Sequence, residues 1–358
     1  MDIRRLFSGN VSISEIHPAK IILAVFLIAY PSFTSDFFTF QIGAYSLILG
    51  TIALSLMMLA GYGGMVSLAQ MSAAGFSGYI MAIFGENSVS VMGFGWPWWL
   101  TIITAILCGA LFSTIVGAIS VRTEGIYTIM ITLAIAVAFF YFVRQNYHIF
   151  NGFTGFAGIE PPKLFGINWR DPVPFYYLTL FMAAFFLWAV FHCSRSTFGL
   201  GIQAIRDNPR RMRALGYHVG WHRITAYFFS GLIAGTAGVL LVWFNGRISP
   251  GSIGVEVVID ILVIAVVGGI RSPIGPFLGA IVFVLLENFA IDLIDRERFN
   301  TVIGLVFLLV VLFSPDGLLG LWNRIYPKIR FRRSVRTNGG RTQWDDSVSS
   351  GSFKTVNQ

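Results

Sequence analysis

Two carboxylates four residues apart, Glu256 and Asp260, are the most prominent charged groups in the apolar parts of this sequence. Residues at positions i and i+4 lie on one face of a helix. Asp260 falls in a stretch, 255 to 270, that is apolar enough to lie in a bilayer, where an ionised carboxylate is costly unless it faces a partner group or water. We therefore expect Asp260 either to line a polar pathway or to link two helices. Glu287 and Asn288 have the same two interpretations.

A second polar set lies in a glycine-rich segment, GYGGMVSLAQMSAAGFSGYIMAI (61 to 83). Its glycines and alanines let helices approach closely, and Ser67, Gln70 and Ser77 offer hydrogen bonds inside the hydrocarbon region. These three side chains are candidates for the lining of a pathway. The alternative is close helix packing, with the polar groups bridging neighbouring helices.

Catalytic chemistry has little support in this sequence. No GxxxxGK[ST] string occurs, and none of the four lysines follows a glycine-rich phosphate loop, so we expect no nucleotide hydrolysis by this chain. His218 and His222 are four residues apart but lack the glutamate of a zinc protease motif and a third ligand. We predict no enzyme activity and no metal or cofactor in this chain.

The elements that position these residues are predicted to be membrane-spanning helices. The chain is 55% hydrophobic and 12% charged, with a mean hydropathy of +0.72, and a bilayer core of ~30 Å takes roughly 20 helical residues to cross. We predict an all-α polytopic membrane protein with about ten spans, in a range of roughly eight to ten. The spans are 21 to 38, 43 to 61, 65 to 84, 98 to 120, 126 to 143, 174 to 192, 224 to 245, 255 to 270, 274 to 291 and 301 to 319. Trp96, Trp98 and Trp99 predict an interfacial aromatic belt.

Charge orients these spans. Ten crossings from a cytoplasmic N-terminus place 19 of the 25 Lys and Arg residues on one side and 6 on the other, as the positive-inside rule requires. This predicts a cytoplasmic leader (1 to 20), a transmembrane domain (21 to 322) with a cytoplasmic loop (193 to 223), and a basic, disordered cytoplasmic tail (323 to 358). The segment GGIRSPIGP (268 to 276) has two interpretations. It separates either two spans or the two halves of one broken helix. Because topology explains the net charge of +8, we expect membrane lipid and not nucleic acid as a partner.

The cytoplasmic loop contains a segment suited to a protein partner, AIRDNPRRMRALG (204 to 216), named here the docking segment. It predicts two short amphipathic turns broken at Asn208 and Pro209. Apolar side chains are expected to enter a groove of the partner while the charged ones stay in water; the alternative is that the arginines anchor the loop to anionic lipid. The residues assigned to docking are Ala204, Ile205, Arg206, Asp207, Arg210, Arg211, Met212, Ala214, Leu215 and Gly216, with Ile205, Met212 and Leu215 as the inserted apolar groups.

From the docking segment onward, the sequence resembles the permease subunits of branched-chain amino acid ABC importers. The matching strings are SGLIAGTAGVLL (230 to 241), ISPGS (248 to 252), IDILVIAVVGGIRSPIGPFLGA (259 to 280) and LFSPDGLLGL (312 to 321). The glycine-rich segment resembles the family's third span, RTEGIYTIMITLA (122 to 134) its fifth, and NGFTGFAGI (151 to 159) its following external loop. The resemblance covers roughly residues 50 to 322, and the long N-terminus and RTEGIY are similar to the M-type rather than the H-type subunit.

The resemblance implies a complex in the bacterial cytoplasmic (inner) membrane. A second homologous permease, two ATPase subunits that bind ATP and Mg, and a periplasmic or extracellular substrate-binding protein would be the partners, with the docking segment on an ATPase. The implied function is high-affinity uptake of branched-chain amino acids or a related small polar solute. Gln70 stands where the family often has His, and Asp260 where it usually has Glu. The alternatives are a urea or short-chain amide permease of the same family, or a gradient-driven secondary transporter.

Overall fold

The structure, a computed structural model, describes residues 18–88, 93–123, 125–162, 166 and 168–293, and the single positions 304, 308, 317 and 318. Nearly all of this part is helical, and its strands form one antiparallel pair, β1 (Phe156–Ala157) with β2 (Arg247–Ile248). The predicted all-α membrane fold is confirmed. The α-helices are α1 (Pro18–Phe33), α2 (Tyr45–Met57), α3 (Gln70–Phe84), α4 (Trp98–Ser120), α5 (Ile126–Gln145), α6 (Tyr147–Phe150), α7 (Pro172–Arg195), α8 (Thr197–Asp207), α9 (Pro209–Ala214), α10 (Val219–Asn245), α11 (Val255–Gly268) and α12 (Gly275–Leu293). The π-helical η3 (Phe38–Ala44) and η4 (Met58–Tyr62) flank α2, and the short 3₁₀ helix η5 (Pro250–Ile253) precedes α11.

Nine of the ten predicted spans coincide with helices in the described part of the chain, and the tenth (301 to 319) lies outside it except for isolated positions. Within the described part of the chain, five helices are long and apolar enough to cross a membrane: 38–62, 98–120, 126–145, 172–195 and 219–245. Two of these, η3–α2–η4 and α10, are mostly buried within the protein, whereas only about a third or less of α4, α5 and α7 is buried. The first two therefore form the centre of the bundle, and the other three face its surroundings.

Two predicted spans are shorter helices than the sequence suggested. α3 has 15 residues and α11 has 14, about 20 Å of helix each and less than the ~30 Å of a bilayer core. The chain approaches α3 through a non-helical segment, 63 to 69, in which Gly64 has a φ of +66°. It approaches α11 through β2 and η5. Gly63 and Gly64 interrupt the helix that hydropathy alone would begin at residue 65, whereas α11 begins at Val255 as predicted and ends at Gly268, two residues earlier than predicted.

The segment from 255 to 291 forms two helices packed side by side. Gly268 lies directly against the backbone of Gly275, and Gly279 lies against the carbonyl of Ile264, so α11 and α12 run antiparallel with their backbones in contact. Only glycine permits this approach, because a Cβ at these positions would overlap main-chain atoms. The two stretches are therefore two antiparallel helices, and whether they are two spans or two re-entrant halves stays a prediction.

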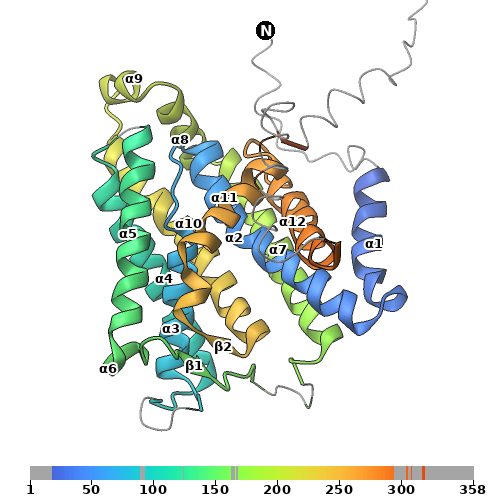
Figure 1. Ribbon diagram of the computed structural model, residues 1–358. Coiled ribbons are helices and arrows are strands. Elements are labelled where there is room, and N and C mark those ends of the chain that lie inside the picture. Colours follow the sequence, from blue (N-terminus) through green and yellow to red (C-terminus); the bar gives the residue numbers. More distant parts are fainter. Residues whose placement is uncertain are drawn as a thin grey trace, which may run out of the picture.

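Figure 1 shows α8 and α9 at one end of the bundle and α6, β1 and β2 at the opposite end. The turn between α11 and α12 belongs to the α8–α9 end, because the carbonyl of Ile270 lies against Gly61 and Gly61 contacts α8. Arg271 and the loop from 193 to 223 are therefore at the same end, as the predicted crossings require.

Small residues hold the central helices together. Gly238 of α10 packs on the carbonyl of Ala74 in α3, Gly231 packs on Ala110 in α4, and Gly109 of α4 faces α3 and α10. Because lipid tails give no hydrophobic driving force between helices, close van der Waals contact of this kind is what associates them. The α3–α4–α10 interface is the rigid centre around which the candidate functional groups are placed.

Candidate functional site

A buried polar group joins three helices at the start of α3. The side-chain oxygen of Gln70 accepts a hydrogen bond from Ser230 Oγ of α10 at 3.0 Å and lies 3.4 Å from Ser55 Oγ of α2. Ser230 Oγ is also 2.7 Å from the carbonyl oxygen of Ser55. All three residues are buried. The amide of Gln70 thus links α2, α3 and α10 at the point where the non-helical approach becomes helix.

The other two polar candidates of this segment are also buried in the interior. Ser77 Oγ donates to the carbonyl of Gly235 in α10 at 2.9 Å, and Ser67 is fully buried. The main-chain N–H of Leu68 donates to Thr132 Oγ1 of α5 at 3.1 Å, which ties the approach to α3 to a further helix. The geometry of Gln70 and Ser77 is that of helix packing with polar bridges. Their assignment to a pathway stays a prediction.

The acidic candidates lie elsewhere, on α11 and α12. Glu256 is exposed and Asp260 is half-buried, and Asp260 is within electrostatic reach of Glu256 and of Glu287 on α12. Tyr45 of α2 is in turn within reach of Asp260 and Glu287. Among the described residues, no three His, Cys, Asp or Glu side chains are arranged to hold a metal ion. The five predicted pathway residues therefore lie in two separate places. Ser67, Gln70 and Ser77 are buried in α3 or just before it, whereas Glu256 and Asp260 lie on α11.

Three partners of these groups were missed in the sequence: Ser55, Ser230 and Tyr45. Ser230 begins the small-residue string 230 to 241, so its place at a helix interface had a local signal. Ser55 and Tyr45 had none, because each lies in an apolar stretch and acquires its role only from a helix distant in sequence.

The docking segment consists of two short helices, broken where the sequence predicted. α8 ends at Asp207 and α9 begins at Pro209. Asn208 Oδ1 accepts from the N–H of Arg211 at 2.9 Å and caps α9, and Ser196 Oγ accepts from the N–H of Gly199 at 3.2 Å and caps α8. A side-chain cap of this kind stabilises a helix by about 1 kcal/mol. Both short helices therefore have fixed starting points.

The prediction that three apolar side chains of this segment insert into a partner is wrong for Ile205 and Met212. Ile205 and Met212 are buried within the chain, where they form a small core with Val219 at the start of α10. They cannot insert into another protein, because they already close the angle between α8 and α9. Leu215 is 67% exposed and remains the apolar group of the segment that is available to a partner.

The charged face of the docking segment is open. Arg210, Arg211 and Arg213 are exposed beside Leu215. Arg206 differs from them, because its guanidinium bonds to the carbonyl of Gly61 and its aliphatic part packs against Gly64. The segment thus presents arginines and one leucine outward, while Arg206 fastens it to the chain that leads into α3.

Long apolar helices around a glycine-packed centre, with a basic two-helix segment fixed at one end, define a multi-pass membrane permease. Residues 38–311 match the family described as "Branched-chain amino acid transport system / permease component", and the chain belongs to this family. The resemblance in the sequence is confirmed.

Three relatives illustrate the family. The chain is 25% identical over 320 residues to the high-affinity branched-chain amino acid transport system permease protein LivM of Escherichia coli (strain K12), covering 83% of this chain and 73% of the relative. It is 26% identical over 242 residues to the nucleoside ABC transporter permease protein NupC of Lactococcus lactis, covering 64% of this chain and 74% of the relative. It is 32% identical over 127 residues to the permease protein BraD of Pseudomonas aeruginosa, covering 36% and 41%. No solved structure matches the chain significantly.

Proposed function

We propose that this chain is the membrane-spanning subunit of an ABC importer that takes up branched-chain amino acids or a related small polar solute. The observation that carries the proposal is the docking segment, a capped pair of helices that presents Leu215 and arginines outward and is fastened by Arg206 to the core. A permease driven only by a gradient has no need of such a segment. Membership of the permease family and the transport function of the relatives support the same proposal.

The proposed complex contains a second homologous permease, two ATPase subunits and a periplasmic or extracellular binding protein, in the bacterial inner membrane. ATP and Mg are bound by the ATPases, and this chain is non-catalytic. The α8–α9 end faces the cytoplasm in this proposal, because it carries the exposed arginines. The β1–β2 end, with Glu160 and Arg170 paired at 2.7 Å, faces the binding protein.

The open face of α11 is proposed as the wall of the pathway. Val255 and Ile259 are exposed there, and Asp260 and Glu256 lie on the same helix. A carboxylate at membrane depth requires a partner or water, and a polar pathway bounded by the second permease supplies both. Ser67, Gln70 and Ser77 are buried away from this face, and their place in the pathway stays a prediction.

Force from the ATPases reaches this wall through rigid contacts. Movement of α8 pulls Arg206, which is bonded to Gly61 and packed on Gly64. Gly61 also lies against the carbonyl of Ile270 in the turn between α11 and α12. The docking segment therefore contacts the chain that leads into α3 directly, and reaches the turn that ends α11 through Gly61. A displacement of α8 would in this way be passed on to α11.

The test is uptake by the assembled complex. The chain, its ATPases, second permease and binding protein are reconstituted in proteoliposomes, and uptake of labelled leucine, urea and a nucleoside is measured with and without ATP. ATP-dependent uptake of leucine, competed by isoleucine and valine, supports the proposal. ATP-dependent uptake of the nucleoside alone would replace the substrate, as the nucleoside relative suggests. Uptake that needs an ion gradient and no ATP would overturn the proposed class.

A further inference from the structure

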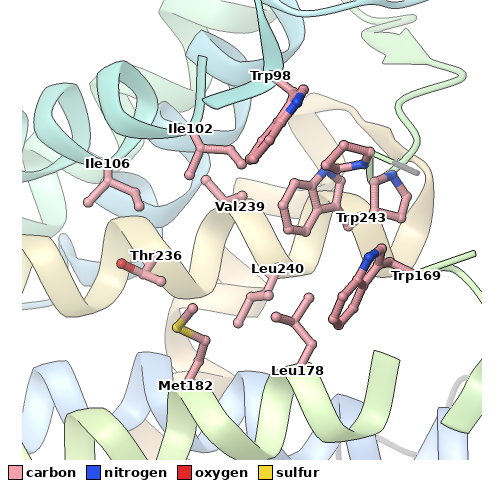
Figure 2. A pocket seen from close by; sticks show the side chains of 12 residues that line it. Trp98, Ile102, Ile106, Trp169, Leu178, Met182, Thr236, Val239, Leu240 and Trp243 are labelled. Carbon is pink, nitrogen blue, oxygen red and sulfur yellow. The ribbon is translucent and has the colours of Figure 1, made fainter. Parts of the chain in front are cut away.

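An apolar cavity of about 250 Å³ lies between α4, α7 and α10 at the β1–β2 end of the bundle, away from the docking segment and from the acidic face of α11. α10 packs closely on α4, while α7 packs on η3 and α2, and the space left between these groups is the cavity. Figure 2 shows Trp98, Trp243 and Trp169 around its outer part and Ile106, Thr236 and Met182 at its inner part.

The walls of this cavity exclude the transported solute. They are almost entirely carbon, and the hydroxyl of Thr236 is already bonded to the carbonyl of Leu232 at 2.8 Å. The nearby charges, Glu160 and Arg170, pair with each other outside the lining. A free amino acid carries an ammonium and a carboxylate, and burying either without a charged partner is prohibitive. Water is also a poor occupant, because apolar cavities of roughly 150 Å³ stay dry and take up hydrocarbon.

The indole nitrogens of Trp169 and Trp243 offer no polar contact to an occupant. Both are buried and make no hydrogen bond with any residue that the structure describes, but they have almost no accessible surface, and the lining of the cavity is almost entirely carbon. The occupant is therefore expected to be apolar along the whole cavity.

The position of the cavity fits a membrane lipid. From Trp98 to Ile106 it extends eight residues along α4, about 12 Å, and half of a bilayer core is ~15 Å. Only about a third or less of α4 and of α7 is buried within the protein, as is typical of helices that face lipid. The tryptophans stand at the outer end, where the ester carbonyls of a glycerolipid lie, and the inner end is at acyl-chain depth.

We propose that this cavity binds one acyl chain of a phospholipid from the leaflet at the β1–β2 end. The lipid fills the gap between α7 and the α4–α10 pair. It therefore joins α7 to the centre of the bundle in place of protein side chains.

The test uses the full chain assembled with its partner subunits in liposomes of phosphatidylcholine whose acyl chain carries a photoactivatable diazirine. Crosslinked residues are located by mass spectrometry. We expect crosslinks at Met182 and Leu240 inside the cavity, in addition to those of ordinary surrounding lipid at the exposed Ile103 and Leu107.

A matched pair of variants distinguishes the cavity from the lipid-facing surface. Ile102 lines the cavity and its neighbour Ile103 faces outward. Ile102→Trp fills the space and should lower the cavity crosslinks several-fold while leaving those at Leu107 unchanged; Ile103→Trp should lower neither. Equal crosslinking in both variants would mean surrounding lipid only and would overturn the proposal. An absence of cavity crosslinks in the unmodified complex would do the same, because the cavity would then hold no lipid.

Discussion

Arg206 donates a hydrogen bond from Nη1 to the main-chain carbonyl of Gly61, a residue 145 positions earlier in the chain. Its side chain also pairs with Asp207 at 3.0 Å and packs against Gly64, whose φ of +66° and missing Cβ leave room for it. One arginine thus joins the docking segment to the chain that enters α3. The first two predictions separate the two functions of this segment, attachment to the core and contact with a partner.

Attachment is tested by Arg206→Gln. The change removes the bond to Gly61, which contributes about 1 kcal/mol at a partly exposed site, so the complex should assemble while ATP hydrolysis becomes poorly linked to uptake. The ratio of solute transported to ATP hydrolysed in proteoliposomes measures this. Arg210→Gln is the control, because Arg210 is exposed on the outer face. An unchanged ratio in Arg206→Gln would show that force does not pass through Gly61.

Partner contact is tested by Leu215→Asp. If Leu215 enters a groove of the ATPase, an unpaired carboxylate there should weaken binding at least tenfold, about 1.4 kcal/mol or more. Co-purification of the ATPase subunits should fall while membrane insertion stays normal. Leu200→Asp is the matched control, since Leu200 is also exposed but lies outside the predicted docking residues. Greater sensitivity to Arg→Gln changes at 210, 211 and 213 than to Leu215→Asp would favour lipid anchoring.

Asp260→Asn tests the acidic face of α11. The amide has nearly the shape of the carboxylate but no charge, so assembly should be preserved. If Asp260 lines the pathway, the maximal rate of solute uptake should fall, whereas the amount of assembled complex should not. Glu256→Gln is compared with it, because Glu256 shares the helix face and is more exposed. Normal uptake in Asp260→Asn would assign this carboxyl to helix linkage.

Close packing of α10 on α3 is tested by Gly238→Ala. A Cβ at Gly238 would overlap the carbonyl of Ala74, and overpacking of this kind costs about 1–3 kcal/mol. The thermal unfolding temperature of the purified protein should fall. Gly220→Ala on the same helix is the control, because its added Cβ would lie 3.6 Å from Val121, an ordinary van der Waals contact. Equal unfolding temperatures would contradict the tight α3–α10 contact.

Orientation is tested with single cysteines at Asn168 and Arg213 in a background lacking the native cysteines. Both positions are exposed, one beside the β1–β2 end and one in α9. An impermeant thiol reagent added to intact cells should label the cysteine at 168, and the one at 213 should react only after the cells are opened. Labelling of both in intact cells would overturn the number of crossings between them.

The sequence by itself determined the features that depend on nearby residues. Runs of apolar residues predicted nine helices that the structure describes, because each stretch must satisfy its own backbone in lipid. The break at Asn208 and Pro209 was also predictable, since proline starts a helix and asparagine caps it within three residues. The family resemblance rested on short strings of this local kind.

Tertiary structure decided which face of each helix meets another part of the chain. Hydropathy could not show that Ile205 and Met212 are buried while Leu215 is exposed, because all three are apolar and the difference arises from the angle between α8, α9 and α10. Gln70 acquires its bridging role from Ser230, 160 residues away. The apolar cavity exists because α7 packs on η3 and α2 and not on the face of α10 that lines the cavity. Such properties depend on packing between distant segments, and no local pattern encodes them.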